Sequence, residues 1–125
     1  MSERKLEQGS MYIEAMIALT VLAMALIAIA PLFVLAAREN AYAGELTVAT
    51  TLAQAKAEQL TAEVYADLAD DSDSVKVRDM RYERSWTVAA DAPHPGIKTV
   101  TITVTPERPT AGPNTSATVS LYRIP

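Results

Sequence analysis

Residues 15–37 read AMIALTVLAMALIAIAPLFVLAA and contain no charged side chain. At about 1.5 Å of rise per residue they form roughly 34 Å of helix, which is enough to cross the hydrocarbon core of a bilayer. A helix that covers the core of a small soluble protein keeps a polar face, and this segment has none. The segment therefore predicts a membrane-spanning helix.

A cleaved secretory signal is the nearest alternative for this segment. The apolar region of such a signal usually runs for about 7–15 residues and ends at a site of small residues. The segment is longer than that, although small residues do follow it in VLAARENAYAG, residues 34–44. Its length favours a retained span, and cleavage at that end stays an alternative.

The charges that flank the span predict its orientation. Arg4 and Lys5 precede it and Arg38 follows it directly. The positive-inside rule then favours a cytoplasmic N-terminus and an exported C-terminal part. The absence of cysteine suits an exported chain, and it excludes disulfides, thiolate zinc sites and a cysteine nucleophile.

The composition excludes several classes of function. The 125 residues allow one domain, and the net charge of −4 gives no footprint for nucleic acid. The single histidine, His94, excludes a two-histidine metal site within one chain. No catalytic triad or paired-carboxylate site is recognisable, so we expect no catalytic residue, no metal, no cofactor and no enzyme activity.

The first 31 residues, MSERKLEQGSMYIEAMIALTVLAMALIAIAP, resemble the class III signal of type IV pilins and pseudopilins. In that family a short charged leader ends in Gly, a peptidase cuts after the Gly, and the new N-terminus is methylated. A Glu occupies the fifth position of the mature chain. Here Gly9 ends the leader, Ser10 is the first mature residue and Glu14 is the fifth. Pro31 falls at the mature position where many type IV pilins have a kinking proline.

The resemblance implies a role for each of these residues. Prepilin peptidase would cut between Gly9 and Ser10, Ser10 would be N-methylated, Glu14 would act in assembly, and Pro31 would kink the helix. Ser10 itself departs from the Phe that the family usually carries. The alternative interpretation of Glu14 is an interfacial carboxylate favoured by the dipole at a helix N-terminus.

A second helical stripe follows the span. Between residues 46 and 68 the apolar residues recur at steps of three and four, which predicts an amphipathic helical half over 38–69. The stripe consists of Leu46, Ala49, Ala53, Ala57, Leu60, Val64 and Leu68. The polar residues Gln54, Lys56, Glu58, Gln59 and Glu63 are expected largely away from it. Such a stripe needs a partner surface.

The period changes to two in the C-terminal part of the chain. RYERSWTV (81–88), IKTVTITVT (97–105) and residues 117–121 alternate apolar with polar residues between Pro- and Gly-rich loops, which predicts about three antiparallel strands. The acidic run 70–74 misses the spacing of a calcium loop and is expected to be a solvated loop. Trp86 lies on the apolar face and is expected to pack between sheet and helix.

These patterns predict an α+β fold in which a sheet over 70–125 packs on the helical half 38–69. The resemblance adds a leader over 1–9 and an assembly helix over 10–37 before them. The resemblance implies the same ladle-like shape. Within the family, RYERSWTV (81–88), the proline-containing turn and IKTVTITVTP (97–106) look most like minor pilins of the type IV pilus modification (PilV-like) kind. Minor pseudopilins of type II secretion have a similar plan.

The resemblance also implies partners and a location. The partners are other pilin or pseudopilin subunits, the prepilin peptidase and an inner-membrane assembly platform. The chain would sit in the inner membrane as a single-pass protein before it enters a pilus or pseudopilus filament. A single-span anchored periplasmic protein, or a cleaved secreted domain, that binds a partner is the alternative from a different class.

Overall fold

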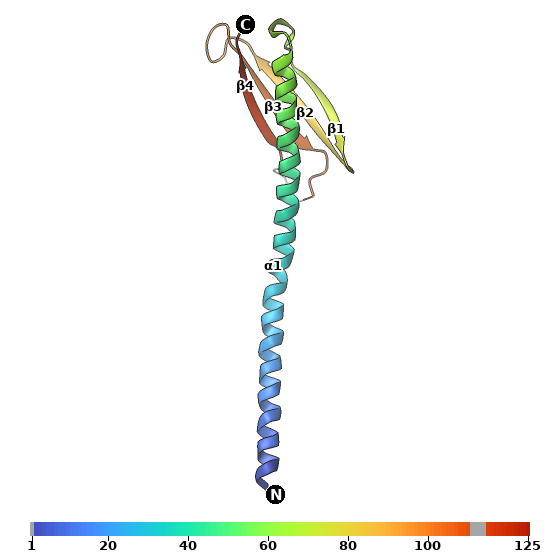
Figure 1. The fold of residues 1–125 in the computed structure, drawn as a ribbon, viewed down its shortest axis with the longest axis vertical. Coiled ribbons are helices and arrows are strands. Elements are labelled where there is room, and N and C mark those ends of the chain that lie inside the picture. Colours follow the sequence, from blue (N-terminus) through green and yellow to red (C-terminus); the bar gives the residue numbers. More distant parts are fainter. Residues whose placement is uncertain (1, 111–114) are drawn as a thin grey trace. The chain divides into compact units, whose positions relative to one another are not determined.

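The computed structural model describes residues 2–110 and 115–125 (Figure 1). Side chains are described from residue 9 onward. Part of the predicted Pro- and Gly-rich loop, 111–114, lies outside the described residues, as does Met1 of the predicted leader. The elements are α1 (Ser2–Ala62), a 3₁₀ turn η1 (Tyr65–Asp67), β1 (Asp71–Val77), β2 (Met80–Ala89), β3 (Lys98–Pro106) and β4 (Ala117–Arg123). The chain divides into two compact units, Met1–Arg38 and Glu39–Pro125. We call the second unit the sheet domain.

The helix α1 ends at Ala62, earlier than the predicted boundary at residue 69. Val64 already has an extended backbone, and its side chain is exposed rather than part of the stripe. Leu68 is buried nonetheless, because the chain folds back beyond the helix. Two cationic side chains donate to backbone carbonyls just beyond this end: Arg123 to that of Glu63 and Lys98 to that of Tyr65.

The sheet has four antiparallel strands in the order β1-β2-β3-β4, so each strand pairs with its neighbour in sequence. The prediction of about three strands missed β1, and the expectation of an acidic loop over 70–74 is wrong. Asp73, Val75 and Val77 are the half-buried residues of this strand, while the residues between them are exposed. Asp73 lies directly opposite Arg84 of β2. Arg84 compensates the negative charge of Asp73, which is part of the acidic run that had favoured a loop.

One face of the sheet packs against the sheet-domain part of α1, as predicted (Figure 1). From the helix, Ala49 and Ala53 are fully buried and Leu60 is nearly so. Their partners on the sheet include Trp86, Val100, Ile102 and Val104. Trp86 is 7% exposed, so the expectation that it packs in this core is confirmed. The α+β class predicted from the sequence is the fold of the chain.

We predict that Ala53→Leu destabilises the sheet domain by about 1–3 kcal/mol, because a fully buried alanine leaves no room for three more carbon atoms. Ala55 is exposed on the same helix, so Ala55→Leu is the matched control and is expected to have little effect. Urea unfolding of the detergent-solubilised chain, followed by Trp86 fluorescence, measures both. An equal loss in the two variants would contradict this packing.

Candidate functional site

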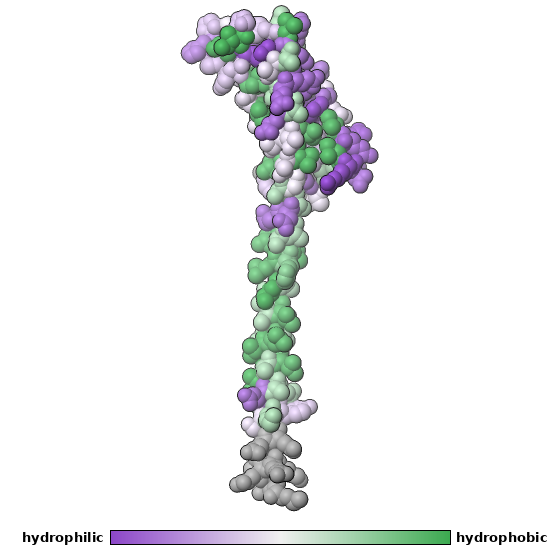
Figure 2. Space-filling model, in the orientation of Figure 1, coloured by the Kyte–Doolittle hydropathy of each residue, from purple (hydrophilic) through white to green (hydrophobic). Residues whose placement is uncertain are grey.

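The apolar surface of the N-terminal unit is uncovered. The large apolar side chains between residues 11 and 35 are 45–74% exposed, and Figure 2 shows this hydrophobic surface along α1. Among the described residues, one helix is long and apolar enough to cross a membrane. Its Thr20 hydroxyl donates to the carbonyl of Met16 at 2.8 Å, so this polar group is satisfied inside the helix, as hydrocarbon requires. Residues 15–37 are therefore a candidate membrane span.

The predicted processing residues lie just before this span, on the same continuous helix. Ser10 and Glu14 are exposed and four residues apart, so both lie on one face, separated by about 6 Å of rise. A Cβ added at Gly9 would meet no atom within 4 Å, and its backbone is helical. Glycine weakens a helix interior, so it is not favoured here by the backbone. Neither packing nor backbone geometry therefore explains why position 9 carries a glycine.

Pro31 lies inside α1, and the helix continues through it. Proline has no N–H, so the carbonyl of Ile27 loses its partner four residues later. In a membrane such a freed carbonyl is satisfied by a neighbouring helix, a hydroxyl or water. The kink expected at Pro31 stays a prediction.

A buried polar cluster joins α1 to β1 and β2. Arg84 donates two hydrogen bonds to Asp73, from Nε to Oδ1 at 2.6 Å and from a terminal nitrogen to Oδ2 at 2.5 Å. Lys56 Nζ lies 3.5 Å from Asp73 Oδ2 and 3.8 Å from the centroid of the Trp86 ring. It also donates to Gln59 Oε1 at 3.3 Å. The cluster fastens the helix to the two strands.

The structure corrects the expectation that Lys56 lies away from the buried stripe, since its side chain is 6% exposed. The steps from Ala49 to Ala53, Lys56 and Leu60 are four, three and four, so the helical period does place Lys56 on the buried face. Ala57, which the apolar pattern assigns to the stripe, is only half-buried. The residue that could have indicated this is Trp86, because the face of its ring attracts a cation and so favours a lysine that burial would otherwise exclude.

The charges within this cluster compensate one another. Hydrogen bonds from Arg84 lower the pKa of Asp73, and the nearby charges of Arg84 and Lys56 lower it further against the opposing effect of burial. Among the described residues no three His, Cys, Asp or Glu side chains are grouped to hold a metal. Asp70 of the acidic run is engaged as well, accepting the Val88 amide at 2.6 Å.

Comparison with known proteins adds no assignment. No protein-family model, curated protein or solved structure matches this chain. A functional proposal therefore rests on two features of the chain itself: the residues that precede the candidate span, and the fold of the sheet domain that follows it.

We predict that Asp73→Asn lowers the free energy of unfolding by about 1–2 kcal/mol at pH 7, a range that allows for the partial exposure of the carboxylate. Because the pKa of Asp73 is lowered in the folded state, its stabilising effect is complete above the ordinary Asp pKa of about 3.9 and disappears as the pH falls through the lower folded value. The difference between the wild type and the variant should therefore shrink below that pH.

Urea unfolding at pH 7 and at several acidic pH values measures this difference. The control is Glu83→Gln on the exposed face of β2, which should leave stability nearly unchanged. A loss for Asp73→Asn that persists undiminished in acid would show that the ion pair is not its source.

Proposed function

We propose that this chain is a minor type IV pilin, a non-catalytic subunit that prepilin peptidase cuts after Gly9. Residues 15–37 hold the precursor in the inner membrane, and the mature chain then enters or primes a filament. The observation that carries the proposal is the placement of Gly9, Ser10 and Glu14 directly before a charge-free helix whose apolar side chains are uncovered.

Cleavage changes the electrostatics at the start of the helix. It removes four charged residues of the leader and creates an α-amino group on Ser10, one helical turn before Glu14. Cleavage also frees the amides of the new first turn, so the positive end of the helix dipole comes to lie beside the Glu14 carboxylate. The mature N-terminus thus carries one positive and one negative group within reach of each other.

This pair explains how a carboxylate is tolerated at the membrane. A charged residue at the centre of a spanning helix costs about 2.5–3.5 kcal/mol on insertion scales, and pairing reduces that cost. In the membrane Glu14 can pair with the amino group of its own chain. When it pairs instead with the amino group of a neighbour, the contact fixes the axial register of two subunits, because a buried unpaired charge penalises any other register.

The architecture of the sheet domain favours a filament subunit over a free-standing receptor domain. A single layer of four strands covers one side of the helix, and the helix is both the anchor and half of the core. Chain-to-chain contact through α1 therefore carries the folded sheet domain along with it. The small domain favours a minor subunit over the bulk subunit of a filament.

A minor pseudopilin of type II secretion is the second candidate, because the same residues before the span would serve it. Its filament remains in the periplasm, whereas a pilin is recovered in filaments sheared from the cell surface. A single-span anchored protein is the candidate from a different class. It would keep residues 1–9 and would tolerate any uncharged residue at position 14.

We predict that Glu14→Ala is inserted and cleaved normally but enters filaments at a small fraction of the wild-type level. The substitution removes the partner of the Ser10 amino group and leaves the cleavage site intact. Immunoblots of sheared filaments and of membranes measure incorporation against total protein. Glu39→Ala, which neutralises a carboxylate outside the span, is the matched control and should incorporate normally. Normal incorporation of Glu14→Ala would refute the role of the carboxylate.

We predict that Gly9→Val blocks removal of the leader, so that the uncut precursor accumulates in the membrane. Gly44→Val is the matched control, because a Cβ at Gly44 likewise meets no atom within 4 Å in the same helix. It should be cut normally. The two forms differ by nine residues and separate by gel mobility in cells that contain prepilin peptidase. Equal processing of the two variants would show that Gly9 is not the residue that is recognised.

A further inference from the structure

The cationic side chains of the sheet domain fall into two groups. Lys56, Arg84, Lys98 and Arg123 are used within the fold. The first two meet Asp73, and the other two donate to backbone carbonyls beyond the end of α1. The remaining four lysines and arginines of the domain are exposed, and all four line one groove; they are Lys76, Arg78, Arg81 and Arg108.

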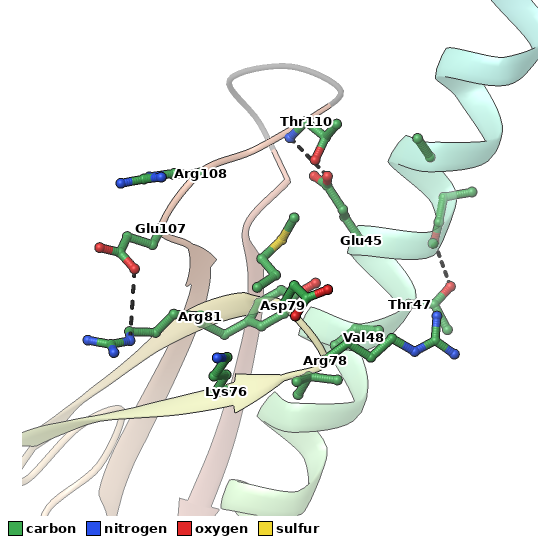
Figure 3. A pocket seen from close by; sticks show the side chains of 16 residues that line it. Glu45, Thr47, Val48, Lys76, Arg78, Asp79, Arg81, Glu107, Arg108 and Thr110 are labelled. Atoms are coloured by element: carbon green, nitrogen blue, oxygen red, sulfur yellow. Dashed lines mark hydrogen bonds and ion pairs between the residues drawn. The ribbon is translucent and has the colours of Figure 1, made fainter.

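This basic groove has a volume of about 1120 Å³ and is walled by three segments of the sheet domain (Figure 3). One wall is the part of α1 from Ala41 to Val48. The β1–β2 turn, which carries Arg78, and the segment after β3, which carries Arg108, form the others. The volume is ample for a phospholipid headgroup.

The cations of the groove are not matched by its acids. Its four cations face three acids: Asp79, Glu107, which lies 3.9 Å from Arg81, and the buried Glu45, of which Oε1 accepts the amide of Thr110 at 2.9 Å and Oε2 has no partner among the described residues. Lys76 lies directly opposite Arg81 in the β1–β2 register. Like charges in such a pair destabilise a sheet, so the arrangement favours an anion on this surface.

The opposite end of the domain has the opposite charge. Beyond the middle of its helix lie six exposed or half-buried acids besides Asp73, against the two cations Lys98 and Arg123; these acids are Glu58, Glu63, Asp67, Asp70, Asp71 and Asp91. Hydrogen bonds bring the segments at this end together. Arg123 donates to the Glu63 carbonyl, Tyr65 donates to the Gly96 carbonyl, and the Val88 amide donates to Asp70. The domain therefore has a basic end at the start of its helix and an acidic end beyond it.

Chain connectivity limits the distance between the end of the candidate span and the helical wall of the groove. Ala41 of the groove is four residues beyond Ala37, so no more than about 14 Å of chain separates them. If residues 15–37 span the bilayer, the groove lies within reach of the headgroup layer, and Arg38 lies between the two. This proximity favours lipid over a second copy of the chain as the source of the anion.

We propose that the basic groove binds the headgroups of anionic phospholipids, and that this contact holds the sheet domain against the membrane surface before assembly. The attraction comes from Lys76, Arg78 and Arg108, while the acidic end is repelled and turned away from the surface. The proposal rests on the membrane span of the proposed function. Departure from the bilayer then requires this contact to be broken.

The test uses the full chain inserted in nanodiscs of phosphatidylcholine alone or with phosphatidylglycerol. Hydrogen exchange of the peptides covering 76–81 and 107–110 reports on the groove. We expect exchange to slow by about fivefold or more in the anionic discs, since one Lys or Arg near an anionic surface changes an equilibrium by about that factor. The slowing should vanish in 0.5 M salt, where the Debye length falls to about 4 Å.

The variant Lys76→Gln/Arg78→Gln/Arg108→Gln should lose the effect. Glu58→Gln/Asp67→Asn, which changes exposed charges at the acidic end, is the control and should keep it. Equal exchange in the two kinds of disc, with the chain inserted, would overturn the proposal. So would slowing that is independent of lipid charge and rises with the number of chains per disc, because that result assigns the groove to a second copy. A chain that fails to insert contradicts the span itself and thereby also the proposed function.

Discussion

The apolar surface of residues 15–37 has to be kept from water, and nothing in the described part of the chain covers it. Burial of apolar area is the dominant favourable term in folding, so an uncovered stripe of this length demands another apolar environment. In the proposed function a bilayer supplies it first, and the helices of neighbouring subunits would supply it in a filament. Each part of the proposed function is a consequence of moving this one surface between those two environments.

The same helix serves a different purpose in the sheet domain. There Ala49 and Ala53 let the sheet approach closely, and Lys56 is accepted in the core because Asp73 and the Trp86 ring compensate its charge. Breaking one partner of such a cluster leaves a buried charge, so the cluster resists separation of helix and sheet. The sheet is thereby tied to the sheet-domain part of α1.

Much of this fold could be predicted from the sequence, because two strong periodicities dominate it. The charge-free run, the stripe of period 3.6 and the alternating strands led to the α+β class and to the burial of Trp86. The errors lie where a tertiary contact overrides a local pattern. Strand β1 reads as an acidic loop until Arg84 faces Asp73, and Lys56 reads as a surface residue until Trp86 covers it. The early end of α1 was missed because Leu68 keeps the helical spacing although it is no longer in the helix.

The candidate processing residues were all identified from the sequence, whereas the basic groove was not. Gly9, Ser10 and Glu14 lie within six residues of the sequence and were identified through the family resemblance, but Lys76, Arg81 and Arg108 come together only when β1, β2 and the segment after β3 are assembled. The central claim is that the chain matures by cleavage after Gly9. Mass spectrometry of the protein isolated from cells with active prepilin peptidase tests it most directly. The account predicts a mature chain that begins at Ser10, and an intact segment 1–9 would contradict it.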